Sequence, residues 1–214
     1  MARAVDDIVC VPANEAPWSD LAAVLGSVGA SRQCWCQRYK LERGEAFRRF
    51  PAEERAGRLR EQAHAGEPDS PVTSGLLAYR DGEPVGWCAV EPRPAYQGMV
   101  RNQRVPWEGR EEDRADESVW AITCFVTRPG HRRQGVAGAL ARAAVDFARR
   151  RGARALEGYP IAPGNAISEE LHVGTDGVFR DAGFREVIRP TLRRIVMRID
   201  FPEAEGAVPS QPVT

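Results

Sequence analysis

The sequence lacks the marks of several classes of protein. It has 30 basic and 30 acidic side chains and a formal net charge of zero, so the basic excess that is typical of nucleic-acid-binding proteins is missing. It has no run of about 18 apolar residues, which is the length that a membrane-spanning helix needs. Residues 1–7 carry charges and no apolar core, which is not the pattern of a secretory signal. The composition therefore predicts that the protein binds neither nucleic acid nor membranes.

Cysteine and histidine are also scarce. The five cysteines are an odd number without a paired framework, and there are three histidines. Unpaired cysteines favour a reducing, cytoplasmic location. Cys34 and Cys36 flank Trp35 in a Cys-x-Cys pattern, but the other three cysteines do not supply a second pair at metal-ligand spacing. The sequence therefore predicts no metal site.

The remaining composition is that of an ordinary globular protein. Hydrophobic residues make up 43% of the chain and charged residues 28%, which are usual values for a folded domain. A length of 214 residues is typical of one domain. We expect a single domain over residues 1–201, followed by a polar, proline-containing tail over residues 202–214 that is predicted to be disordered.

Residues 126–140 form the most informative segment. An apolar strand over residues 119–126 leads through a short basic turn into a helix over residues 136–151. The first N–H groups of a helix have no partner within it, and the helix dipole adds partial positive charge there. Gly135 lets the backbone approach a bulky ligand without a side chain in the way. The segment therefore predicts an anion site suited to phosphate or pyrophosphate, although an ordinary strand–turn–helix could carry the same glycines.

The hydrophobic pattern alternates between strand and helix periods along the chain. Strands are predicted at residues 8–11, 75–80, 84–90, 119–126, 153–159, 184–188 and 194–199, and helices at residues 18–25, 51–65, 136–151 and 176–182. We expect residues 91–117 to be a long irregular connection, either a lid over a site or a solvated excursion. This order of elements predicts an α/β fold with a mixed, mostly antiparallel sheet.

The anion segment resembles a family signature. Arg132-x-x-Gly135-x-Ala137 is similar to the Arg/Gln-x-x-Gly-x-Gly/Ala motif of the GNAT N-acetyltransferases, and the segment that ends in Gly183-Phe184 resembles a second landmark of that family. The resemblance covers most of the chain after the first 74 residues. It implies a GNAT-like central sheet with helices on both faces, in which a splayed pair of strands holds CoA.

Three further segments resemble an uncharacterised bacterial group of GNAT-like proteins. These segments are Cys34-Trp35-Cys36, Ile122-Thr123-Cys124-Phe125 and Glu157-Gly158-Tyr159-Pro160. The resemblance divides the domain into an acceptor side over residues 1–74, made of a strand and helices, and a CoA-binding core over residues 75–201.

The resemblance also implies that acetyl-CoA is the co-substrate. Amides of the loop would hold its pyrophosphate, and its thioester would lie between the strands at residues 119–126 and 153–159. The residues that the resemblance assigns to CoA are Phe125, Val126, Arg132, Arg133, Gln134, Gly135, Val136, Ala137 and Gly138. Those that it assigns to the acceptor pocket are Trp35, Thr123, Cys124 and Phe179.

The chain departs from the family at Phe179, where many members carry a tyrosine that protonates the leaving thiolate. Phenylalanine has no hydroxyl, so we expect other side chains to act as acid and base. The candidates are Glu91, Tyr159 and His172, the last because histidine titrates near neutral pH. A packing role for Tyr159 and an exposed loop position for His172 stay open. A covalent acetyl-cysteine at Cys124 is not favoured, because a cysteine inside an apolar strand is usually a small core residue.

We therefore expect an acetyl-CoA-dependent N-acetyltransferase. Aromatic and apolar residues around the expected pocket favour a small-molecule primary amine, which would attack the thioester directly in a ternary complex. The acidic block at residues 108–117 leaves a protein or peptide amine as an alternative, and Phe179 leaves a non-catalytic acyl-CoA sensor as another. The sheet edges and the C-terminal strands are compatible with a homodimer.

Overall fold

The computed structural model describes residues 8–102, 105–162 and 168–202. In this part of the chain, seven strands form one sheet in the order β1-β2-β3-β4-β5-β7-β6. The strands are β1 (Ile8–Pro12), β2 (Gly75–Arg80), β3 (Glu83–Pro92), β4 (Val119–Thr127), β5 (Ala155–Gly158), β6 (Arg185–Ile188) and β7 (Val196–Asp200). Neighbouring strands are antiparallel except for β4 and β5, which run parallel. The predicted mixed, mostly antiparallel sheet is confirmed. The predicted disordered tail, apart from Pro202, lies outside the described residues.

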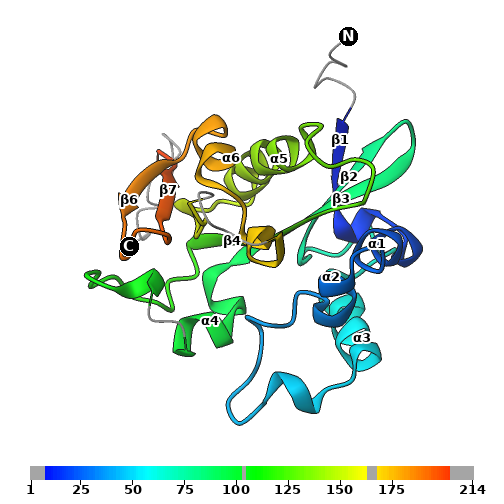
Figure 1. Cartoon of the computed structure of the whole chain (residues 1–214), viewed down its shortest axis with the longest axis horizontal. Coiled ribbons are helices and arrows are strands. Elements are labelled where there is room, and N and C mark those ends of the chain that lie inside the picture. Colours follow the sequence, from blue (N-terminus) through cyan, green and yellow to red (C-terminus); the bar gives the residue numbers. More distant parts are fainter. Residues whose placement is uncertain (1–7, 103–104, 163–167, 203–214) are drawn as a thin grey trace, which may run out of the picture.

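Helices cover both faces of the sheet, as expected (Figure 1). One face carries α5 (Val136–Arg150) and α6 (Asp176–Asp181), and the other carries α1 (Trp18–Leu25), α2 (Gly29–Cys34), α3 (Ala52–Ala63) and α4 (Gln97–Asn102). Short 3-10 turns lie at η2 (Ala13–Glu15), η3 (Phe47–Arg49), η4 (Arg93–Ala95), η5 (Val105–Trp107) and η7 (Ser168–Val173). Among the described residues, no helix combines the length and the apolar character needed to cross a membrane.

The two faces follow from the alternation of side chains along the strands. Leu76 and Cys88 pack toward α5, whereas their chain neighbours Leu77 and Trp87 pack toward α1. Helix α5 meets the sheet through an apolar stripe at helical spacing. The stripe includes Val136, Leu140, Ala144, Phe147 and Ala148, all buried.

Two segments for which the sequence predicts irregular structure contain helices. Helix α2 lies in the glycine- and cysteine-rich segment after α1, and α4 lies in the connection between β3 and β4. Tyr96 and Met99 of that connection are buried and pack against Ala121 of β4. Each helix has six residues, which is too short to display a clear 3.6-residue period. Tertiary packing defines them in place of a local pattern: α2 packs on α3, and Met99 of α4 packs against the sheet.

Strand β4 parts from β5 halfway along its length. The parallel ladder joins residues 119–122 to residues 155–158 and ends there, while β4 continues to Thr127 in its ladder with β3. A bulge lies at the same point, because Ala89 pairs with Cys124 and the next residue, Val90, pairs with Ile122. The predicted splayed pair of strands is therefore present.

The ring of Phe179 fills the space beside the end of β5. It is fully buried, and a Cβ atom on Gly158 would overlap it. The same ring meets Phe125 at 5.8 Å and Phe184 at 5.0 Å between ring centroids, both in edge-to-face geometry. Only glycine leaves room for this ring at position 158, the last residue of β5.

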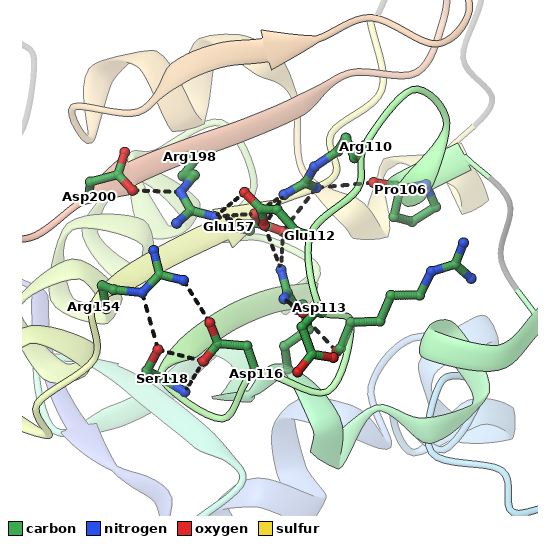
Figure 2. A network of polar contacts seen from close by, with 12 residues as sticks. Pro106, Arg110, Glu112, Asp113, Asp116, Ser118, Arg154, Glu157, Arg198 and Asp200 are labelled. Atoms are coloured by element: carbon green, nitrogen blue, oxygen red, sulfur yellow. Dashed lines mark hydrogen bonds and ion pairs between the residues drawn. The ribbon is translucent and has the colours of Figure 1, made fainter.

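A buried cluster of ion pairs ties residues 105–118 to the sheet (Figure 2). Glu157 of β5 is fully buried and lies among three guanidinium groups. These belong to Arg93, Arg110 and Arg198, and each donates to a Glu157 oxygen. The Arg198 contact is 2.8 Å long and the Arg93 contact 3.4 Å. Glu112, which is more exposed, pairs with the same three arginines.

The charges of this cluster control the titration of Glu157. Burial raises the pKa of its carboxyl group, but the hydrogen bond and charge of Arg110, together with the charge of Arg93, outweigh burial and lower the pKa. A carboxylate whose pKa is lowered by folding stabilises the fold above its unfolded pKa. That stabilisation is lost as the pH falls through the folded pKa.

We expect Gly158→Ala to lower the free energy of unfolding by about 1–3 kcal/mol, because the new methyl group overpacks a filled core at the Phe179 ring. Urea denaturation measures the change. Gly57→Ala is the control: it lies in α3, no atom lies within 4 Å of the new methyl group, and alanine favours a helix. Equal midpoints for the two variants would contradict the packing argument.

We expect Glu157→Gln to lower the free energy of unfolding by about 3–5 kcal/mol at neutral pH, because three arginines lose the fully buried carboxylate and keep only the more exposed Glu112 as their shared partner. Wild-type stability should also fall as the pH drops below about 5, the region where an unfolded glutamate begins to bind protons, and the variant should lack this part of the fall. Denaturation curves at several pH values measure both effects. Glu186→Gln is the control, because this more exposed carboxylate also pairs with two arginines and should cost at most about 1 kcal/mol.

Candidate active site

The predicted anion segment forms the start of α5. The helix begins at Val136, after Gly135 at φ 85°, and no side chain of the described residues caps it. Its first N–H groups, including those of Ala137 and Gly138, therefore point out of the helix end without a cap. Arg132 and Arg133 are exposed on the same turn. The arrangement can bind an anion through backbone N–H groups, with added positive charge from the helix dipole and the two arginines.

Arg80 of β2 holds this turn in shape. It is 6% exposed, and its Nη1 donates to Gln134 Oε1 at 2.7 Å while its Nη2 donates to the Gln134 carbonyl at 2.9 Å. Gln134 Nε2 in turn donates to the Gly130 carbonyl at 2.6 Å. Arg80 lies 54 residues from Gln134 in the chain, and sequence reasoning missed it. Arg80 ends β2, which β3 separates from β4 in the sheet, so the sequence carries no signal for this contact.

Phe125 and Val126 lie on β4 beyond the point where β5 leaves it. Phe125 pairs with Cys88 of β3, and Val126 pairs with Trp87. Both side chains are buried. Because neither residue belongs to the ladder with β5, their backbone lies beside the gap, as the sequence predicts for CoA contacts.

The predicted acceptor residues lie in two different environments. Thr123 and Cys124 lie in β4 at the gap, Thr123 buried and Cys124 half-buried. Trp35 is 9% exposed and stacks on Trp18 at 5.7 Å between ring centroids, so it packs among α1 to α3. The ring of Phe179 is in the core on the α5 face, with no exposed area. The structure brings Thr123 and Cys124 to the gap but does not bring Phe179 to an open surface.

Glu91, the first acid–base candidate, is engaged by two other side chains. Its Oε1 accepts a hydrogen bond from Ser74 at 3.2 Å, and its Oε2 forms an ion pair with Lys40. Lys40 Nζ also donates to the Ser74 hydroxyl at 3.0 Å. All three side chains are buried. Lys40 and Ser74 were not predicted, and their sequence distance from Glu91 gives no signal for the contact.

Tyr159, the second candidate, donates its hydroxyl to Glu157 Oε2 at 2.8 Å. Burial, followed by the negative charge of Glu157, raises the pKa of this hydroxyl well above its ordinary value. The geometry therefore makes Tyr159 a hydrogen-bond donor within the cluster around Glu157.

His172, the third candidate, is half-buried in η7, which lies against β4. Its ring stacks on Tyr39, with 6.5 Å between ring centroids and 24° between the planes. Tyr39 precedes Lys40 in the chain, so His172 faces the same segment that supplies the partner of Glu91. Among the described residues, no three His, Cys, Asp or Glu side chains are grouped so that they could hold a metal ion.

The solved structures show that this architecture has relatives. The yncA protein of Salmonella typhimurium, described as a candidate acetyltransferase and solved with its cofactor acetyl-CoA, is 15% identical, with a TM-score of 0.52 over 94% of this chain and 97% of that one. A GCN5-related N-acetyltransferase from Kribbella flavida is 17% identical, with a TM-score of 0.52 over 92% of this chain and 100% of that one. At these identities the likeness shows the fold. No curated protein sequence matches the chain.

The likeness in fold does not by itself assign the chain to a family, but a match to a family sequence model does. The model of the acetyltransferase (GNAT) family matches residues 35–173. The match spans well over half of the chain and includes the segment after α2, the gap between β4 and β5, and the start of α5. The chain belongs to the GNAT family of acetyltransferases.

Proposed function

We propose that the protein transfers the acetyl group of acetyl-CoA to a primary amine of a small molecule. In this proposal the amine attacks the thioester directly, in a ternary complex of enzyme, acetyl-CoA and amine. The observation that carries the proposal is the uncapped start of α5 beside the gap between β4 and β5. The presence of acetyl-CoA in the yncA structure, which has the same fold, supports this donor.

The donor would bind along the path from the turn into the gap. The pyrophosphate would accept hydrogen bonds from the backbone of residues 134–138 and be attracted by Arg132 and Arg133. The pantetheine arm would lie in the gap, against the backbone of Phe125 and Val126. The thioester would then reach Thr123 and Cys124, where the bulge interrupts the ladder with β3.

The acidic block in residues 108–117 supports a small acceptor over a basic peptide. Glu112 pairs with the arginines around Glu157, and Asp116 pairs with Arg154 at 2.6 Å. Acids that are paired within the chain attract an external cation less strongly, because their charge is already compensated. Glu112 and Asp116 therefore anchor their own segment, which weakens the argument for a protein or peptide amine.

The chemistry requires a base, because an alkyl ammonium group must lose a proton before it attacks. We assign this role to His172, whose half-buried ring lies beside β4. Glu91 is less suited, because both of its oxygens already have partners. The backbone N–H of Val126 would stabilise the oxyanion of the tetrahedral intermediate.

A second candidate function is a sensor that binds acetyl-CoA without transferring the acetyl group. The observation in its favour is that Glu91 and Tyr159 are both engaged by other side chains, while Phe179 has no hydroxyl. Calorimetry with acetyl-CoA, followed by an assay of CoA thiol release with a panel of amines, separates the two functions. Binding without release for every amine would favour the sensor, and absence of binding would exclude both.

We expect Gly135→Val to weaken acetyl-CoA binding at least about tenfold, or about 1.4 kcal/mol, because a side chain would enter the anion site and strain a left-handed residue. Titration calorimetry measures the affinity. Gly152→Val is the matched control: Gly152 has φ 77°, a similar strain, at the opposite end of α5. If both variants bind acetyl-CoA equally well, the site is not at the start of the helix.

We expect His172→Gln to lower kcat for amine acetylation about 100-fold, the usual contribution of a general base, with little change in acetyl-CoA affinity. The CoA thiol-release assay measures kcat, and calorimetry measures the affinity. His64→Gln is the control, since His64 lies at the end of α3 and pairs with Glu67. A rate for His172→Gln that matches the rate for His64→Gln would remove His172 from the mechanism.

A further inference from the structure

Two cysteines from distant parts of the chain meet on the sheet face that α1 to α3 cover. Cys36 follows α2 and is 7% exposed, and Cys124 is half-buried in β4. Cys36 belongs to the apolar cluster on this face, Cys124 packs against that cluster, and a hydrogen bond between the two thiols is the largest cause of the pKa shift of each. The indole N–H of Trp87 donates to the sulfur of Cys36 at 3.1 Å. A sulfur that accepts two hydrogen bonds is in the environment that favours a thiolate.

The backbone at Cys36 is strained and firmly held. Trp35 and Cys36 are consecutive residues in the left-handed region, at φ 46° and 55°, a conformation that costs non-glycine residues about 1–3 kcal/mol each. The stacking of Trp35 on Trp18 and the hydrogen bonds of Gln37 to Trp35 and Gln62 hold the segment in place. Such strain persists only where the surroundings overdetermine it, and it is typical of functional positions.

The charges around the two sulfurs differ. The hydrogen bond from Cys124 lowers the pKa of Cys36, and the hydrogen bond from Trp87 and the charge of Lys40 add to this effect, which outweighs burial and the charge of Glu91. The hydrogen bond to Cys36 and burial raise the pKa of Cys124 well above its ordinary value. The pKa of Cys36 is therefore shifted down and that of Cys124 up, which makes Cys36 the more easily deprotonated of the two thiols.

A second pair of cysteines lies on the opposite face of the same sheet. Cys88 is fully buried in the core against α5, with Cys10 packed at the edge of that core. Burial raises the pKa of Cys10 to about 11 and that of Cys88 well above its ordinary value. Both thiols are protonated at neutral pH, so this pair provides an internal comparison for the reactivity of Cys36 and Cys124.

We propose that Cys36 and Cys124 form a peroxide-sensitive site that hydrogen peroxide converts into a disulfide between the segment after α2 and β4. The thiolate of Cys36 attacks one peroxide oxygen and the O–O bond breaks, which leaves a sulfenic acid on Cys36 and a hydroxide that takes up a proton to become water. The sulfur of Cys124 then attacks the sulfenic sulfur, and the S–O bond breaks. The oxygen leaves with the thiol proton as a second water. The two thiols are oxidised and the peroxide is reduced.

The disulfide would lie where β4 leaves β5. Cys124 is two residues beyond Ile122, the last residue in the ladder with β5. A bond from Cys124 to Cys36 would fix the segment after α2 against the gap and remove the charge on Cys36. The oxidation itself does not depend on the proposed function. Its consequence does: we expect the oxidised protein to lose acetyl transfer, and dithiothreitol to restore it.

The test is a peptide map of the full chain after treatment with hydrogen peroxide. Remaining thiols are alkylated, the protein is digested without reduction, and the peptides are identified by mass spectrometry. We expect a cross-linked peptide that contains Cys36 and Cys124 and is two hydrogen atoms lighter than the sum of its parts. We also expect it to form on the order of tenfold or more faster than any oxidation of Cys10 or Cys88, because the thiolate is the reactive species.

Two variants test the order of the steps. Cys124→Ser should stop at the sulfenic acid, which a dimedone probe then labels on Cys36, and Cys36→Ser should abolish the disulfide. Cys88→Ser is the matched control and should leave the disulfide unchanged. The peptide map of the wild-type protein tests the proposal even if a variant fails to fold. A bond between Cys34 and Cys36, full recovery of alkylated Cys36 and Cys124, or equal oxidation of the Cys10 and Cys88 pair would each overturn the proposal.

Discussion

The parting of β4 from β5 is the constraint on which the rest of the structure depends. Strand β5 ends at Gly158, so its parallel ladder with β4 stops at Ile122, whereas β4 continues to Thr127 in its ladder with β3. The Phe179 ring, which packs on Gly158, and the bulge in β4 lie at this point. Because α5 follows β4 directly, the turn before α5 and the gap are necessarily neighbours.

In the half of the β4–β5 pair where the ladder is present, buried ion pairs surround β5. Glu157 lies opposite Ala121 in the ladder, and the buried arginines around it join β5, β7 and the connection between β3 and β4 (Figure 2). Buried ion pairs pay a desolvation penalty that can match their attraction. Their contribution here is therefore to define the position of β5 more than to add net stability. One half of the pair is held by these contacts, and the other half is left open.

The two faces of the sheet carry different kinds of side chains. The α5 face is an apolar core, filled by aromatic and aliphatic side chains. The opposite face holds the Lys40–Glu91 pair, the Cys36–Cys124 contact and the stacked ring of His172. These groups come from the first 74 residues and from η7 as well as from the strands. This face is therefore assembled from segments that lie far apart in the sequence.

The sequence by itself determined the features that are local. The strand, turn and helix around Gly135 are consecutive, so their spacing predicted this unit, and the order of strand and helix patterns predicted the class of sheet. The tertiary structure alone decided the partners of the polar groups: Glu157 with its arginines, Glu91 with Lys40, Gln134 with Arg80, and Cys36 with Cys124. These pairs lie far apart in the chain, and a single sequence carries no period or spacing that links them. Their meeting depends on which strands become neighbours and on which face each side chain points, and both follow only when the whole sheet is packed.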